Sequence, residues 1–203
     1  TEIMSANTRK PKTGMLTLLG SPEQHRVYIA GGRDPYDNTR EVLANFDLSP
    51  LKGKRVLLKP NAGRIAVSGS GVVTDRRVVA AAIDAFREAG AEVAVGESPI
   101  IGVRTEEAFE VTGIAAAARE RNVPLLDLDD GDFIEMNFPE GVALKFLRVC
   151  APVLEFDLIV SIPVMKTHMH TGVTLSVKNM KGCLWRRSKV RLHMLPPVAG
   201  RDE

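Results

Sequence analysis

The chain has 203 residues, of which 44% are hydrophobic and 26% charged, and its formal net charge is +2. These values suit one well-filled globular core, and they exclude a disordered chain and a generally basic one. No apolar stretch reaches the roughly 18 residues of a membrane-spanning helix, so we expect no membrane span. We expect the polar residues 1–22 to form a flexible N-terminal arm.

The positive charge is concentrated near the C-terminal end. Residues 1–157 carry 19 Lys and Arg against 23 Asp and Glu, whereas residues 158–203 carry 8 against 2. The first part therefore has a net charge of −4 and the second of +6. Such a split indicates a localised positive surface.

The two cysteines, Cys150 and Cys183, are too few for a disulfide framework and lack Cys-x-x-Cys spacing. This chain alone therefore offers no ligand set for an iron–sulfur cluster or a structural zinc ion. We expect two reduced thiols in a cytoplasmic protein, with Cys150 buried in a strand.

Apolar runs and helical spacings alternate along the chain. The runs predict strands at residues 26–30, 55–59, 91–95, 124–128 and 157–162, and a β-hairpin within 133–149. The spacings predict helices at 38–46, from an N-cap at Thr74 to Ala89, from Thr105, and at 114–121 after a break at Gly113.

This alternation predicts an α/β fold with a mostly parallel sheet flanked by helices, in Rossmann-like layers, plus one small β-hairpin. The α/β domain is expected to span residues 23–185 and to be followed by a basic, Pro-containing tail at 186–203. A doubly wound sheet normally continues beyond this point, so we expect the chain to be an incomplete piece of a longer protein.

Polar residues follow three of the predicted strands. Because ligands bind at the carboxyl ends of the strands in open α/β sheets, we expect these residues to converge on one site. The candidate ligand-binding residues are Asn61, Thr74, Glu97, Ser98, His170, Thr171, Lys178, Asn179 and Lys181, and the candidate catalytic residues are Lys59, Lys166 and His168.

Lys59 ends an apolar strand just before Pro60, where an ammonium group would border a partly dry cleft. It could bind an anion or have a tuned pKa, or it could extend to the surface. The Gly69-Ser70-Gly71 stretch before the Thr74 helix start is equally compatible with an anion cradle and with a plain loop.

His168 and His170 could share one side of an extended segment and form a metal site with Glu97. They could also be ordinary loop residues. His168 is an equally good candidate for acid–base chemistry, because imidazole titrates near neutral pH.

The basic residues 178–191 could neutralise nucleic-acid phosphates. Their aromatic support is limited to Trp185, so nucleic-acid binding is the weaker alternative. A solvated basic face or a protein-docking surface fits better.

Four motifs together resemble the "domain of unknown function 362" family over roughly residues 26–195. They are Val-Leu-Leu-Lys-Pro-Asn at 56–61, Gly-Val-Val-Thr-Asp at 71–75, Gly-Glu-Ser at 96–98, and the run from Lys-Thr-His at 166 to Lys-Asn-Met-Lys-Gly at 178–182. Members of that family are often fused to, or encoded as, proteins with ferredoxin-type iron–sulfur clusters. The resemblance therefore implies a redox setting, although this chain lacks the ferredoxin cysteine motif.

Two hypotheses follow. In the first, the domain binds a small carboxylate or phosphate ligand at the strand ends, as an enzyme of redox metabolism, with Asn61, Ser98 and Asn179 orienting the ligand. In the second, it is a non-enzymatic docking or electron-transfer partner of a ferredoxin-type protein, which it contacts through its basic C-terminal face.

Overall fold

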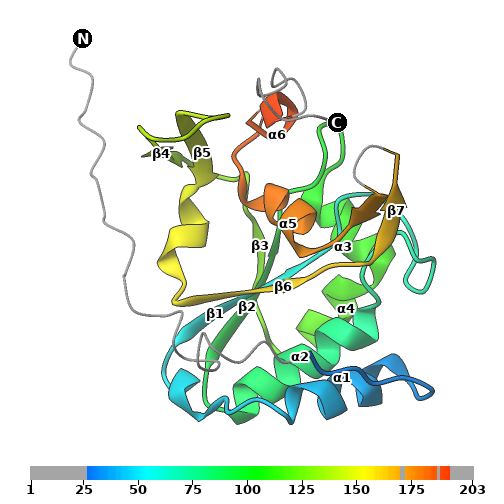
Figure 1. Ribbon diagram of the computed structural model, residues 1–203. Coiled ribbons are helices and arrows are strands. Elements are labelled where there is room, and N and C mark those ends of the chain that lie inside the picture. Colours follow the sequence, from blue (N-terminus) through cyan, green and yellow to red (C-terminus); the bar gives the residue numbers. More distant parts are fainter. Residues whose placement is uncertain (1–26, 170–171, 187, 193–203) are drawn as a thin grey trace.

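The computed structural model describes residues 27–169, 172–186 and 188–192. At its centre is a sheet of four parallel strands in the order β3-β2-β1-β6 (Figure 1). These strands are β1 (Arg55–Pro60), β2 (Glu92–Glu97), β3 (Leu125–Asp127) and β6 (Leu158–Ile162). The predicted α/β class and the mostly parallel sheet are confirmed.

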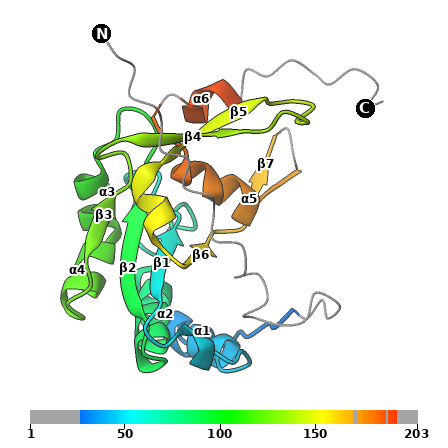
Figure 2. The same ribbon diagram turned by 90° about the vertical axis from the view of Figure 1, so that its left-hand side faces the viewer.

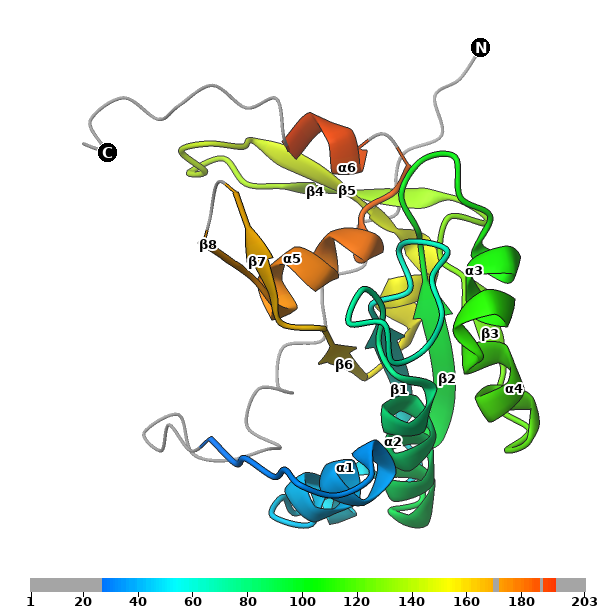
Figure 3. The same cartoon turned by 90° about the vertical axis from the view of Figure 1, so that its right-hand side faces the viewer.

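The central strands are buried on both faces, which explains their continuous apolar sequences. Successive side chains of a strand point to opposite faces, so Val56 and Leu58 of β1 belong to one core and Leu57 to another. The first core is closed by helices on one side of the sheet, as Figure 3 shows. These helices are α2 (Arg76–Glu88), α3 (Thr105–Thr112) and α4 (Ile114–Arg119), with α1 (Pro35–Leu43) packed on α2.

Side-chain caps fix where the first two helices begin. Asp34 accepts a hydrogen bond from the Tyr36 amide ahead of α1, and Asp75 accepts one from the Arg77 amide ahead of α2. The predicted cap at Thr74 is therefore wrong by one residue, because the hydroxyl of Thr74 is used elsewhere. The predicted break at Gly113 is confirmed: this glycine has a left-handed φ of 73° between α3 and α4.

Small elements cover the other face of the sheet. The predicted hairpin is confirmed as β4 (Phe133–Asn137) and β5 (Phe146–Cys150), and α6 lies against it in Figure 2. The remaining elements on the C-terminal side are η3 (Ala151–Glu155), the hairpin of β7 (Lys166–His168) and β8 (Gly172–Thr174), α5 (Ser176–Asn179), η4 (Met180–Cys183) and α6 (Ser188–Arg191). A short turn, η2 (Ser49–Leu51), precedes β1.

The strand predicted at residues 26–30 is wrong for its described part. Residues 27–30 form no strand, and Val27 and Ile29 are 83% and 89% exposed. The segment meets no sheet edge; Tyr28 instead packs edge-on against Phe46, with ring centroids 5.2 Å apart. The predicted arm at residues 1–22 lies outside the described residues.

The order of the strands sets the position of a binding site. From β1 the chain moves outward to β2 and β3, and then returns to place β6 on the opposite side of β1. The carboxyl ends of β1 and β6 are in register, with Pro60 beside Ile162. The loops that leave these two ends must diverge, which opens a crevice at the point where open α/β sheets bind ligands.

Candidate functional site

A cleft of about 600 Å³ lies at this crevice, above the carboxyl ends of β1, β2 and β6. Its walls come from the loop after β1, the Pro99–Ile101 segment after β2, the β7–β8 hairpin, α5 and η4. Figure 3 shows that α5 and the β7–β8 hairpin lie beside the end of the sheet. The structure thus brings together the three predicted strand ends.

The floor of the cleft is a buried ion pair between Lys59 and Glu97. Lys59 Nζ lies 2.6 Å from Glu97 Oε1, and the two side chains are only 1% and 3% exposed. The same ammonium donates to the carbonyl of Pro60 at 2.8 Å and to Asn179 Oδ1 at 3.2 Å. The charge of Lys59 is therefore held by a carboxylate and two further acceptors of the protein.

The Glu97 carboxylate is equally well satisfied. Besides Lys59 it accepts from the backbone amides of Ala62 and Ser98, both at 2.9 Å. A buried ion pair is stable only when its remaining donors and acceptors are also satisfied, and these bonds meet that condition. Glu97 thus fixes the end of β1 relative to the end of β2.

Asn179 locks α5 onto this floor. Its side-chain amide donates to the carbonyl of Lys59 at 2.9 Å and to Ser161 Oγ at 3.0 Å. Both polar atoms of Asn179 are therefore engaged with β1 and β6. Three residues expected to contact ligand (Lys59, Glu97 and Asn179) lie together, but they bind one another.

Gly182 allows η4 to approach the ion pair. A Cβ atom at this position would lie 2.3 Å from Glu97 Oε1 and 2.5 Å from Lys59 Cε. Any larger residue would therefore displace η4 or the ion pair. The glycine at position 182 thus has a structural reason that the sequence alone could not show.

Thr74 joins the two strands that border the crevice. Its hydroxyl donates to the carbonyl of Ile162 at 2.6 Å and accepts from the amide of Asn61 at 2.8 Å. It is 2% exposed, whereas the side chain of Asn61 lines the cleft. Of these two predicted site residues, Asn61 is the one that lines the cleft.

The glycine-rich loop does not leave the start of α2 open for an anion. The amide of Arg76 donates to Ser68 Oγ at 2.8 Å, and that of Arg77 donates to Asp75 Oδ1 at 2.8 Å. The chain's own side chains thus occupy the positions that an anion would take at a helix N-terminus.

Positively charged side chains form the rim of the cleft. They are Arg64, from the loop after β1, Lys166 of β7, Lys178 of α5 and Lys181 of η4. Among the described residues that line the cleft, the one carboxylate is Glu97, which is paired with Lys59. The rim is therefore short of negative charge.

The lysine pKa values reflect this shortage. Burial lowers the pKa of Lys166, and the nearby Arg64 charge lowers it further. Burial and the Lys178 charge do the same to the pKa of Lys181. Like charges held close together favour the neutral amine, and a bound anion would relieve this cost.

His168 lies in the same row as the rim lysines. Its Nε2 is 2.9 Å from Lys178 Nζ, and it shares the half-buried face of β7 with Lys166. An ammonium can only donate, so a charged Lys178 requires the Nε2 of His168 to act as the acceptor. His170 and Thr171, also predicted for the site, lie outside the described residues.

The predicted metal site of His168, His170 and Glu97 finds no assembled counterpart within residues 27–169, 172–186 and 188–192. There, no three His, Cys, Asp or Glu side chains are grouped as metal ligands would be. Glu97 is committed to Lys59 and two amides, and the ring of His168 is beside Lys178.

Ser98 meets a residue that the sequence did not single out. Lys189 of α6 is buried, and its ammonium donates to the hydroxyl of Ser98 and to the carbonyls of Ser98 and Pro99. It also pairs with Asp129 at 2.7 Å. The sequence did not reveal this role, because Lys189 lies in a basic segment that suggested a solvated face. Arg64 was also missed, because it lies in a Gly- and Ser-rich loop.

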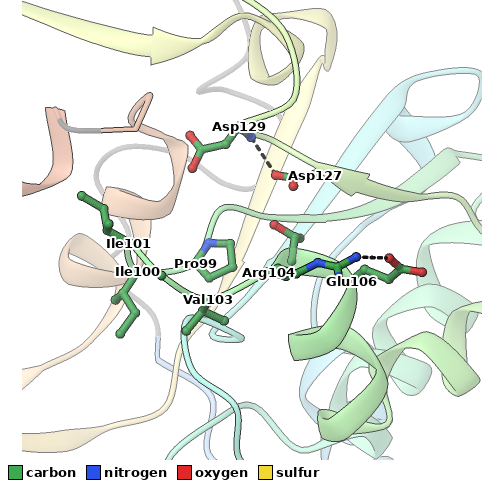
Figure 4. Close-up of a pocket in the computed structure, with 10 residues that line it drawn as sticks. Pro99, Ile100, Ile101, Val103, Arg104, Glu106, Asp127 and Asp129 are labelled. Atoms are coloured by element: carbon green, nitrogen blue, oxygen red, sulfur yellow. Dashed lines mark hydrogen bonds and ion pairs between the residues drawn. The ribbon is translucent and has the colours of Figure 1, made fainter.

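A second hollow of about 390 Å³ lies beyond the Pro99–Ile101 segment, at the ends of β2 and β3 (Figure 4). Its polar groups are engaged within the protein: Arg104 pairs with Glu106 at 3.2 Å, and the backbone amide of Asp129 donates to Asp127 Oδ1 at 2.9 Å. Its lining has the carboxylates of Glu106, Asp127 and Asp129 against the one cation of Arg104, so this hollow lacks the surplus of positive charge that marks the main cleft.

The two cysteines are not among the residues that line the cleft. Cys150 and Cys183 are buried, and burial raises their pKa values to about 12 and about 11. They remain protonated at neutral pH and act as apolar packing groups.

The fold and the cleft define a class: an α/β protein with a parallel sheet and a cation-rimmed crevice at its topological switch point. The chain belongs to the family described as "Domain of unknown function (DUF362)", which matches residues 56–198. It is 29% identical over 150 residues to the "Thylakoid-associated protein sll1697" of Synechocystis sp. (strain ATCC 27184 / PCC 6803 / Kazusa). That match covers 74% of this chain and 44% of the relative's length.

No solved structure matches the chain. Of the helices in the described part, none has the length and apolar character needed to cross a membrane.

Proposed function

We propose that the domain binds a small organic anion, a carboxylate or a phosphate, in the cleft between the ends of β1 and β6. The observation that carries the proposal is the charge of the rim. Arg64, Lys166, Lys178 and Lys181 line a cleft whose one described carboxylate is already neutralised. An anionic ligand supplies the missing negative charge.

The rest of the cleft suits a small molecule. Its volume of about 600 Å³ lies within the ordinary range for ligand pockets, and its walls include Ile100, Pro163 and Leu175. Apolar walls exclude water and strengthen the attraction between an anion and the rim. We assign the orienting role to Asn61, which lines the cleft, because the amide of Asn179 is engaged with the floor.

His168 extends the proposal to catalysis. Its ring lines the cleft beside Lys178, within reach of a ligand held by the rim. An imidazole at this position can accept or return a proton as the ligand reacts. An acid–base step within redox metabolism is the activity that we propose for His168.

The test is stabilisation by an anion. Sodium succinate should raise the thermal midpoint more than sodium chloride at matched ionic strength, because a ligand of the native state shifts unfolding by mass action. The double variant Lys178→Gln/Lys181→Gln should lose this difference. A matched variant, Lys54→Gln/Lys145→Gln, removes the same charge far from the cleft and should keep it; equal responses of the two variants would contradict the proposal.

One observation favours the second candidate, a docking face for an acidic ferredoxin-type protein. Arg148, Arg186 and Arg191 each lie over an aromatic ring of the hairpin or the adjoining segment, at 4.6, 4.7 and 4.9 Å. Arg148 is also paired with Glu135 at 3.3 Å, so Arg186 and Arg191 supply the positive charge of this surface, and such a surface speeds encounter with an acidic partner.

This candidate predicts that Arg186→Glu/Arg191→Glu weakens binding of a four-iron ferredoxin steeply at low salt. Arg33→Glu/Arg104→Glu, placed away from the hairpin, should not weaken it. Binding that is unaffected by the first variant would contradict the docking function.

The cytoplasmic location expected from the sequence stays a prediction.

A further inference from the structure

The rim cations form two pairs that come from different parts of the chain. Arg64 and Lys166 border the loop after β1, and the ammonium of Lys166 donates to the carbonyl of Val72 in that loop at 2.8 Å. Lys178 and Lys181 lie three residues apart on α5 and η4, so they share one side of that helical segment. Each pair is thus anchored separately.

His168 lies between the two pairs. Lys166 and His168 lie on the same face of β7: both are half-buried, whereas Thr167 between them is exposed. Neighbours on one face of a strand are about 7 Å apart, two rises of the strand. On its other side His168 contacts Lys178 at 2.9 Å. The order along the cleft is therefore Arg64 and Lys166, then His168, then Lys178 and Lys181.

The electrostatics agree with two separate centres. The positive charge acting on Lys166 is that of Arg64, and the one acting on Lys181 is that of Lys178. Within each pair the like charges therefore repel, and the one carboxylate among the described cleft residues, Glu97, is paired with Lys59. A single small anion at one pair would leave the repulsion within the other pair unrelieved.

The segments that carry the rim cations also bring apolar residues into the cleft. Pro163 and Val164 precede β7, Leu175 precedes α5, and all three line the cleft, while the ion pair of Lys59 with Glu97 gives the floor no net charge. Such a surface accepts hydrocarbon and gives no support to a third charge. The cleft therefore combines two pairs of cations with apolar walls and an imidazole.

We propose that the ligand carries two anionic groups joined by a short carbon skeleton, as in a dicarboxylate or a phosphorylated carboxylic acid, with the carbon segment beside His168. This inference rests on the proposed anion-binding function and names its ligand class. Arg64 suits one end, because its planar guanidinium can grip a carboxylate or phosphate with two parallel hydrogen bonds.

The test compares matched anions on the full chain by calorimetric titration at constant ionic strength. The probes are propionate, with one carboxylate, and succinate and 2-phosphoglycolate, with two anionic groups. The second contact should make the double anions at least about tenfold tighter than propionate, since a tenfold change needs about 1.4 kcal/mol and charged hydrogen bonds supply that much.

Variants locate the two contacts. Arg64→Gln/Lys166→Gln and Lys178→Gln/Lys181→Gln should each reduce succinate affinity to about that of propionate, whereas Lys54→Gln/Lys145→Gln should leave it unchanged. Equal affinities of the wild type for propionate and succinate, or a loss confined to one pair, would overturn the two-ended ligand while leaving anion binding intact. If none of the three probes binds, the proposed function fails as well.

Discussion

The floor and the rim of the cleft use the same residue types in opposite ways. Lys59 on the floor is 1% exposed and paired with Glu97, and both charged groups make further hydrogen bonds within the protein. Lys166 and Lys181 on the rim are partly exposed and have like charges as neighbours. Lys59 therefore has a structural role in the floor, whereas the rim lysines are the ones that we propose to bind an anion.

The largest effect is expected from removing half of the floor pair. Lys59→Ala should lower the free energy of unfolding by about 3–5 kcal/mol, because it leaves the carboxylate of Glu97 buried and unpaired. Urea unfolding measures this loss. In the double variant Lys59→Met/Glu97→Gln no uncompensated charge remains, so part of the loss should return and succinate should still bind; a double variant as unstable as Lys59→Ala would break the comparison.

The next effect concerns Asp129, which holds α6 through Lys189 and the amide of Arg186. Burial opposes its ionisation, but the hydrogen bonds from Lys189, Ser98 and Arg186 outweigh it and lower its pKa. Asp129→Asn should cost about 1.5–3 kcal/mol, the range for hydrogen bonds to charged groups.

The pH dependence of this contribution follows from the lowered pKa. It is fully present above the unfolded-state pKa of about 3.9 and is lost as the pH falls through the lower folded-state value. Urea unfolding between roughly pH 6 and pH 2 should show a steeper loss in the wild type than in Asp129→Asn. Parallel curves for the two proteins would show that Asp129 is not stabilised as described.

A smaller loss is expected at Gly182, where a methyl group would collide with the Lys59–Glu97 pair. Gly182→Ala should cost about 1–3 kcal/mol, the usual range for overpacking. Gly31→Ala is the control, since nothing lies within 4 Å of a Cβ atom there. Equal stabilities of the two variants would mean that η4 does not press on the floor.

The smallest effect on stability is expected at the rim. Lys178→Gln/Lys181→Gln should change the free energy of unfolding by no more than about 0.5 kcal/mol, as is usual for surface substitutions. The variant should instead weaken anion binding, because it removes two of the rim cations. In the wild type, a bound anion favours the protonated amines and so raises the lowered pKa values of Lys166 and Lys181.

Proton uptake should therefore accompany anion binding, and affinity should fall as the pH rises through these lowered values, below the ordinary lysine pKa of 10.5. Calorimetry of succinate binding in two buffers of different ionisation enthalpy measures the uptake. Binding with no proton uptake in the alkaline range would show that the rim lysines do not meet the anion.

The sequence predicted the fold well because strand burial and helix spacing are local signals. Apolar runs predicted the four parallel strands, and Gly113 predicted the division of two helices. The segment at 26–30 failed because an apolar run becomes a strand only if a sheet edge is available, and that depends on the rest of the fold.

The site was predictable to the level of strand ends but not of individual bonds. Topology placed Lys59, Glu97 and Lys166 around one cleft, as the strand-end rule expects. That Glu97 would neutralise Lys59, and that Lys189 would reach the end of β2, depends on side chains from segments 38 and 91 positions apart meeting in space. No local pattern carries that information.

The most direct test of the central claim is an amide NMR map of the isotopically labelled chain titrated with succinate. The account predicts that the shifted amides cluster in the loop after β1, in β7 and in α5 and η4, and that Lys178→Gln/Lys181→Gln suppresses the shifts. Shifts centred on the β4–β5 hairpin and α6, or no shifts at all, would contradict it.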